Sequence, residues 1–141
     1  MIISQLSVFL ENKSGRLHEV FDVLGQENIN VSACSVADTS EFGILRMIVS
    51  HPEKAFEVLK EKMFSVNISE VISFATPNIA GALAKTLKIM SDAQIGIEYI
   101  YGFSVGKKSF IVLRCENIKA AIDELRSHEM ELICANDLYK F

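Results

Sequence analysis

The sequence contains the same pattern twice, offset by 66 positions. Asn12–Leu17 aligns with Asn78–Leu83, and both segments read Asn-x-x-Gly-x-Leu. Hydrophobic positions keep the same offset, as Leu24 aligns with Met90 and Ile29 with Ile95. A constant offset through most of 141 residues indicates two copies of one supersecondary unit, so every other feature is interpreted within that repeat.

Hydrophobic periodicity predicts the order strand, helix, strand, strand, helix, strand in each copy. In the first copy we expect strands at 2–10, 29–37, 44–49 and 66–73, with helices following Gly15 and His51. In the second we expect strands at 70–76, 95–104, 109–115 and 130–137, with helices at 79–92 and 118–128. This βαββαβ order predicts an antiparallel four-stranded sheet with both helices on one face, the ferredoxin-like arrangement.

The predicted fold class is therefore α+β, with two ferredoxin-like repeats side by side in one continuous antiparallel sheet. We expect repeat 1 to span 1–69 and repeat 2 to span 70–141, rigidly joined because no linker is visible. The fold by itself implies no function, because it hosts many.

Composition excludes several classes of function. A net charge of −4 disfavours a nucleic-acid partner, which requires clustered Lys and Arg. No apolar run approaches the roughly 20 residues of a membrane span, and the N-terminus lacks the features of a signal peptide, so we expect a cytoplasmic protein. Three cysteines without a CxxC motif predict free thiols and no metal site or cofactor, and no catalytic motif is present.

The repeated Asn-x-x-Gly loop has the chemistry to hold a small zwitterion. Gly15 and Gly81 allow close approach to the backbone, and each precedes a helix whose first N–H groups suit a carboxylate. Asn12 and Asn78 each carry a carbonyl that accepts from an ammonium and an amide that donates to a carboxylate. Carboxylate and ammonium together describe an α-amino acid. The alternative is purely structural: the asparagine caps or turns the chain and the glycine permits the turn.

Each copy also resembles an ACT domain, a small regulatory module that binds amino acids. The resemblance rests on Glu11–Leu17, Glu27–Val31, Ala37–Arg46 and Glu98–Tyr101, and it covers the whole chain. It implies that two domains extend one sheet and hold the ligand at their junction, between the first loop of one and the second strand of the other. Asn12 would then grip the ligand and Asn30 would reach in from the second strand. Gly96 replaces Asn30 in the second copy, so the two sites should differ.

Two neighbouring groups leave alternatives open. Tyr99 and Tyr101 share a strand face and form either core packing or an aromatic wall for a large ligand side chain. The polar tract around Asp38 and Glu41 is either a simple turn or a set of ligand contacts. The complete set of predicted ligand-binding residues is Asn12, Ser14, Gly15, Arg16, Leu17, Asn30, Asp38, Ser40, Asn78, Ala80, Gly81, Leu83, Gly96, Glu98 and Tyr99.

The function predicted from these features is that of a non-catalytic, allosteric amino-acid sensor. It would act alone or as the regulatory partner of a metabolic enzyme, and we expect a homodimer paired through the helix-free sheet face. The alternatives are a structural or interaction subunit with vestigial ligand sites and, more remotely, a small enzyme with unrecognised chemistry.

Overall fold

The computed structural model describes residues 1–38 and 41–138, and the chain divides into two compact units. The first unit comprises Ser4–Ser69 together with Leu138, and the second comprises Glu70–Asp137 together with Met1–Ile3. Each unit is described by itself below. That each repeat is a domain in its own right stays a prediction.

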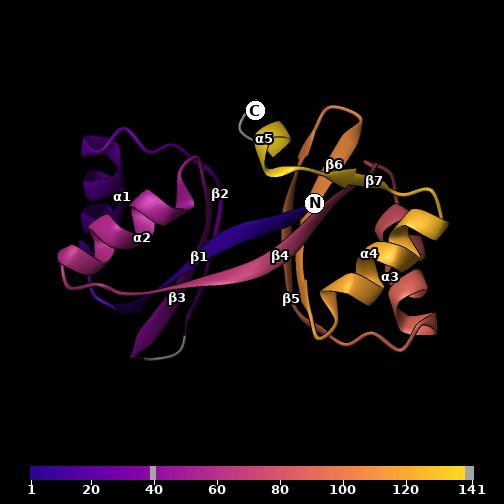
Figure 1. Cartoon of the computed structure of the whole chain (residues 1–141), viewed down its shortest axis with the longest axis horizontal. Coiled ribbons are helices and arrows are strands. Elements are labelled where there is room, and N and C mark those ends of the chain that lie inside the picture. The colour runs from indigo at the N-terminus through magenta and orange to yellow at the C-terminus, as the bar shows by residue number, and fades with distance from the viewer. Residues whose placement is uncertain (39–40, 139–141) are drawn as a thin grey trace. The chain divides into compact units, whose positions relative to one another are not determined.

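The first unit has the predicted βαββαβ order. Its elements are β1 (Ile2–Glu11), α1 (Arg16–Gln26), β2 (Val31–Asp38), β3 (Phe42–Val49), α2 (Pro52–Glu61) and the first part of β4 (Ser65–Pro77). The strands lie in the order β2-β3-β1-β4, and β3 pairs antiparallel with both β1 and β2. Helices α1 and α2 pack on each other and on one side of these strands (Figure 1).

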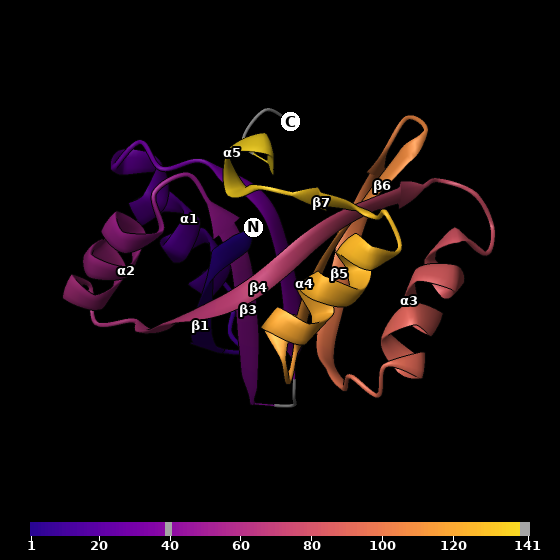
Figure 2. The same cartoon turned by 45° about the vertical axis from the view of Figure 1, so that its right-hand side comes forward.

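The second unit repeats this order. After the second part of β4 come α3 (Ala82–Asp92), β5 (Ile97–Val105), β6 (Lys108–Cys115), α4 (Ile118–Ser127), β7 (Glu131–Ile133) and the short α5 (Ala135–Leu138). Its strands lie in the order β5-β6-β4-β7, with antiparallel pairing of β4 with β6 and β7. Helices α3 and α4 pack together, as Figure 2 shows. The predicted α+β fold with two βαββαβ units is confirmed.

Two predicted element boundaries were wrong. The strands expected at 66–73 and 70–76 are one unbroken strand, β4, which passes from the first unit into the second at Ser69. The last strand, expected at 130–137, ends at Ile133, and α5 follows. The backbone N–H of Asp137 donates to the Cys134 carbonyl at 3.0 Å, so the chain turns into a helix where the sequence predicted extension.

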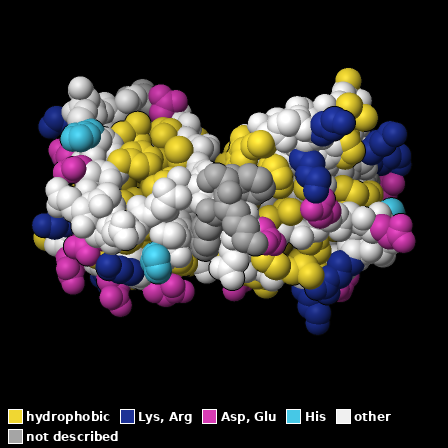
Figure 3. Space-filling model, turned by 90° about the horizontal axis from the view of Figure 1, so that it is seen from above, with side chains coloured by type: hydrophobic (Ala, Val, Ile, Leu, Met, Phe, Trp, Pro, Cys, Tyr) yellow, Lys and Arg dark blue, Asp and Glu magenta, His cyan; other side chains and the backbone are white. Residues whose placement is uncertain are grey.

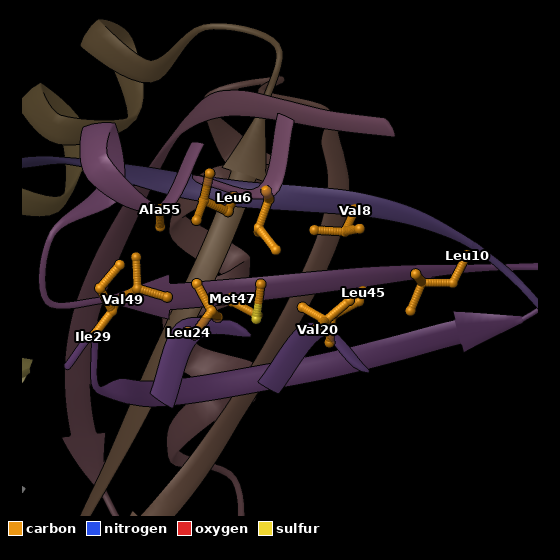
Figure 4. Packing of buried hydrophobic residues seen from close by; sticks show 11 residues of the cluster. Leu6, Val8, Leu10, Val20, Leu24, Ile29, Leu45, Met47, Val49 and Ala55 are labelled. Atoms are coloured by element: carbon orange, nitrogen blue, oxygen red, sulfur yellow. The ribbon is translucent and has the colours of Figure 1, made fainter. Parts of the chain in front are cut away.

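The core of the first unit lies between its strands and its helices. Figure 4 shows Leu6, Val8 and Leu10 of β1 in the same layer as Val20 and Leu24 of α1. These side chains are buried, as the alternating and helical patterns predict. Helix α2 adds Ala55 and Leu59.

The helical spacing of Ala55 and Leu59 continues to Met63 and predicts that Met63 is buried too, but its side chain is 91% exposed. Met63 follows the end of α2 and has a φ of 68°, so the helical stripe stops before it.

The face of β1 opposite Leu6 and Val8 is more buried than its polar residues predict. Alternation along residues 2–10 predicts a half-buried strand with Gln5 and Ser7 on the face opposite Leu6, but both residues are buried, and Gln5 is 0% exposed. Ile3 on the same face is also buried, whereas Phe9 is exposed. Burial of the glutamine amide requires hydrogen-bond partners, one of which is the Ser7 hydroxyl at 3.5 Å.

The two units share backbone conformation at the turns where an L-residue is strained. Gly15 and Gly81 have φ values of 91° and 86°. Positive φ recurs at Asn28 and Gln94, and at Met63 and Glu129, always 66 positions apart and at a helix end. The duplication therefore preserves backbone geometry even where the residue type changes.

The equivalent helix starts at His51 and Asn117 provide a test of local stability. Asparagine favours the N-cap position, and the Asn117 side chain accepts a hydrogen bond from the Ala120 N–H at 3.1 Å, whereas His51 makes no side-chain cap. Replacing Asn117 with Ala should lower the free energy of unfolding by about 1 kcal/mol, because it removes the cap. The matched His51→Ala change should cost clearly less. Urea unfolding of both variants measures this, and equal losses would contradict the assigned cap.

Candidate functional site

The first unit has a cavity of about 250 Å³ beside the loop that joins β1 to α1. It lies between the start of α1 and the end of β2. Six predicted ligand-binding residues line it: Asn12, Ser14, Gly15, Arg16, Leu17 and Asp38. The remaining lining residues are Leu10, Glu11, Lys13, Val36 and Gly43. The structure thus brings together the predicted loop residues and Asp38, which lies more than 20 positions further along the chain.

The second unit has a cavity of about 400 Å³ at its own β4–α3 loop. Of the predicted residues only Leu83 lines it. The other lining residues are Thr76, Pro77, Ile79, Ile100, Tyr101, Gly102, Phe103, Ser104, Ser109 and Ile111.

The two cavities occupy equivalent places in the repeat. Their shared positions, 66 residues apart, are Leu10 and Thr76, Glu11 and Pro77, Lys13 and Ile79, Leu17 and Leu83, Val36 and Gly102, Asp38 and Ser104, and Gly43 and Ser109. Each cavity lies within one unit. The expected contribution of Asn30 or Gly96 from the opposite copy stays a prediction.

Backbone hydrogen bonds hold both loops in the same way. The Asn12 N–H donates to the Glu41 carbonyl at 2.8 Å, and the Asn78 N–H donates to the Lys107 carbonyl at 2.8 Å. Gly15 and Gly81 then turn the chain through the left-handed region into α1 and α3, a conformation that glycine adopts without a steric penalty. No side chain caps either helix start, so N–H groups there lack a side-chain acceptor.

The two loop asparagines have different roles in the structure. The Asn78 Nδ2 donates to the Gly106 carbonyl at 3.1 Å, and its Oδ1 accepts from the Ser104 and Ser109 hydroxyls at 3.4 Å each. Asn78 therefore ties its loop to the β5–β6 hairpin. Within the described ranges 1–38 and 41–138, the Asn12 side chain makes no hydrogen bond, so its amide remains available to a ligand.

Arg16 lines the first cavity, but its charge is already engaged. Its guanidinium contacts Glu19 at 3.0 Å and Glu11 at 3.6 Å. The hydrogen bond and charge of Glu19, followed by the charge of Glu11, raise the pKa of Arg16 above its ordinary value. A ligand carboxylate would have to compete with both glutamates for this guanidinium.

Asn30, Gly96 and Glu98 are among the predicted residues that line neither cavity. Asn30 is exposed, and its N–H donates to the Ser50 hydroxyl at 3.0 Å. At Gly96 an added Cβ would lie 2.5 Å from a Glu116 carboxylate oxygen, so this carboxylate occupies the space of a side chain. Glu98 forms an ion pair with Arg114 at 2.7 Å. Two of the three positions are therefore committed to contacts within the unit.

The last predicted residues are placed as follows. Tyr99 and Tyr101 lie opposite Arg114 and Val112 in the register, on one face of β5 as predicted, but only Tyr101 lines the cavity. Ala80 and Gly81 lie in the loop beside the second cavity without lining it. Ser40 lies outside the described residues.

Most lining residues of the second cavity were missed from the sequence. Ser104 is the clearest case, because Asp38 was selected and Ser104 is its equivalent by the same 66-residue offset. Ile79 and Ser109 had no such signal, because their equivalents, Lys13 and Gly43, are not in the predicted set either. The 66-residue offset therefore identifies Ser104, whereas residue type alone does not.

The sequence of the chain matches the model of a known protein family. The family model of an ACT domain pair matches residues 1–141. The chain is a member of the ACT domain pair family. No curated protein matches it.

Solved structures agree with this assignment. The ACT pair superposes with a TM-score of 0.96 on the crystal structure of protein BT0572 from Bacteroides thetaiotaomicron, with 48% sequence identity, covering 100% of this chain and 98% of that one. The regulatory subunit of aspartate kinase from Thermus thermophilus, in its ligand-free form, matches with a TM-score of 0.68 and 15% identity over 88% of this chain and 91% of its own. Its counterpart from Thermus flavus matches at 0.64 and 15%, covering 90% and 94%. At this identity the kinase subunits share the fold alone.

The three cysteines of the ACT pair differ in their environments. Cys34 and Cys134 are exposed, and burial raises the pKa of the Cys115 thiol. Within residues 1–38 and 41–138, no group of three His, Cys, Asp or Glu side chains could hold a metal ion. In the same ranges, no helix combines the length and apolar character needed to cross a membrane.

The contrast between the asparagines predicts unequal effects on stability. Asn78→Ala should lower the free energy of unfolding by about 1 kcal/mol or somewhat more, because it removes the hydrogen bonds to the β5–β6 hairpin. Asn12→Ala, the matched variant 66 positions earlier, should change it by less than about 0.5 kcal/mol. Urea unfolding measures both, and a larger loss for Asn12→Ala would contradict these roles.

Proposed function

We propose that this ACT pair is a non-catalytic regulatory protein that binds a free amino acid at its βα loops. The observation that carries the proposal is the recurrence of a cavity at the same place in both units, beside a helix start without a side-chain cap. A ligand carboxylate would accept hydrogen bonds from these N–H groups and interact favourably with the positive end of the helix dipole. In the first unit the Asn12 amide would add a partner for the ammonium or the carboxylate.

Binding would regulate through a difference in affinity between two states of the protein. A ligand shifts a conformational equilibrium only by as much as it prefers one state. Each βα loop suits this task, because a backbone hydrogen bond ties it to the following hairpin. The donor is Asn12 in the first unit and Asn78 in the second. A ligand seated there contacts the loop, the helix start and the second strand of the unit together.

The fold shared with the aspartate kinase regulatory subunits supports a role as the regulatory partner of an enzyme. The alternative, a structural subunit with vestigial ligand sites, predicts no response to any amino acid. A cytoplasmic location is part of the proposal.

A second copy of the chain is the expected partner, through the helix-free face of the first unit. Phe9 and Phe42 are 49% and 53% exposed there, and hydrophobic side chains are visible at the surface of both units (Figure 3). The protein should therefore be a dimer by light scattering at micromolar concentration, and Phe9→Ser with Phe42→Ser should shift it toward the monomer because exposed apolar area no longer gains from burial. A wild-type monomer would contradict this expectation.

The test of amino-acid binding is thermal unfolding with each of the twenty amino acids. A ligand at 100 times its dissociation constant should add about 2.7 kcal/mol of stability. Gly15→Asn and Gly81→Asn place a side chain at each uncapped helix start, where the ligand carboxylate would bind. Both variants keep the left-handed backbone accessible, because asparagine tolerates positive φ better than most residues other than glycine. The variant in the binding loop should lose the ligand-induced shift.

The unliganded melting temperature of each variant is the control for folding. The proposal fails if no amino acid stabilises the wild type, or if both glycine variants retain the full shift.

A further inference from the structure

The two equivalent cavities differ in the charge of their surroundings. The first is lined by four charged side chains, those of Glu11, Lys13, Arg16 and Asp38. The equivalent positions in the second unit are Pro77, Ile79, Ala82 and Ser104. None of the described residues that line the second cavity is Asp, Glu, Lys or Arg. One backbone framework thus surrounds two different chemical environments.

The second cavity is also larger, and Gly102 allows the Ile111 side chain to form part of its wall. Gly102 stands where the first unit has Val36. An added Cβ at Gly102 would meet the Phe110 carbonyl and would lie 2.9 Å from Ile111 Cδ1. Ile111 therefore extends over the space that a side chain would fill and becomes part of the lining. At about 400 Å³ the cavity falls within the range of roughly 300–1,000 Å³ typical of small-molecule sites, and the first cavity falls below it.

Apolar side chains at the rim of the second cavity are left open to solvent. Ile79 in the loop is 71% exposed, and Ile100 on β5 is 38% exposed. A ligand with an apolar group would remove this surface from water, which is favourable in proportion to the area covered. In the first cavity, the position of Ile79 is held by Lys13, whose solvated charge would not gain from such contact.

The two serine hydroxyls that line the second cavity are already paired with each other and with Asn78. The Ser104 and Ser109 hydroxyls are 2.8 Å apart, and both lie within 3.4 Å of Asn78 Oδ1. A charged ligand side chain would lose its water without meeting an opposite charge, which is costly. An apolar ligand side chain meets no such penalty.

We propose that the cavity of the second unit takes an amino acid with a large apolar side chain, of the size of leucine or phenylalanine, and that the first cavity does not take the same ligand. The proposal rests on the proposed amino-acid function and adds the ligand class and the unit that binds it. The apolar side chain would lie among Ile79, Leu83, Ile100 and Ile111.

The experiment compares three Ile→Lys variants of the full chain. Ile79→Lys and Ile100→Lys place a charge at the rim of the cavity. Ile97→Lys is the matched control, because Ile97 lies on β5 with Ile100, is 37% exposed, and does not line the cavity. Binding of leucine, phenylalanine, aspartate and lysine is measured by calorimetry. The probe 4-methylpentanoate, which is leucine without its amino group, tests the apolar group separately.

Leucine or phenylalanine should bind the wild type, and Ile79→Lys and Ile100→Lys should weaken that binding by about tenfold or more because the charge loses solvation. Ile97→Lys should leave it unchanged. Binding of aspartate or lysine alone, insensitive to Ile79→Lys, would overturn the ligand class and leave the proposed function standing. Equal weakening by all three variants would overturn the assignment to this cavity.

The absence of binding by all four amino acids would refute the apolar amino-acid proposal. If 4-methylpentanoate still bound and lost affinity only in Ile79→Lys and Ile100→Lys, the apolar cavity would be supported and the amino-acid function would be at fault.

Discussion

The hydrogen bond from the βα loop to the following hairpin is the interaction on which the site of each unit depends. Asn12 donates its backbone N–H to Glu41, and Asn78 does the same to Lys107. This bond holds the loop against the hairpin, and the left-handed glycine that follows directs the chain into the helix. Loop, helix start and second strand then enclose a cavity. Because the donor is the backbone, the geometry does not depend on which side chains surround it.

This independence explains how one chain keeps two copies of a framework with unlike cavities. The turns at Gly15 and Gly81 and the reversed φ at Asn28 and Gln94 agree in both units, since each helix must end and begin in the same place to bury its apolar face. Cavity side chains such as Lys13 and Ile79 are exposed at the surface and contribute little to folding. Their identity is therefore set by what they contact in solution rather than by the core.

The sequence predicted the fold well because hydrophobic periodicity and the 66-residue offset report on burial and backbone. The βαββαβ order of both units followed from these signals. The merging of two strands into β4 was missed, because a continuous strand and two abutting strands have the same alternation. The prediction that Met63 is buried was wrong because the helix ends before this residue. Met63 has a positive φ, which its residue type does not predict.

The candidate site was harder to predict because hydrogen bonding between side chains leaves little trace in a single sequence. Asn12 and Asn78 look alike in the repeated motif, yet the partners of Asn78 come from a hairpin almost thirty positions away. Those partners, Ser104 and Ser109, stand where the first unit has Asp38 and Gly43, so the divergence of the hairpin decides the role of the asparagine.

The loop has two possible roles, to order the backbone and to contact a ligand, and its asparagine differs between the units in these roles. In the second unit Asn78 orders the loop through hydrogen bonds to the hairpin. In the proposed function, the apolar residues around it contact the ligand side chain. In the first unit the asparagine remains unbound among the described residues, whereas the neighbouring Arg16 is held by Glu11 and Glu19. A polar ligand in the first cavity would have to displace existing ion pairs, whereas an apolar ligand in the second displaces only water. The second cavity therefore offers the larger net gain from binding, and the polar residues that make the motif recognisable are not those that would select the ligand.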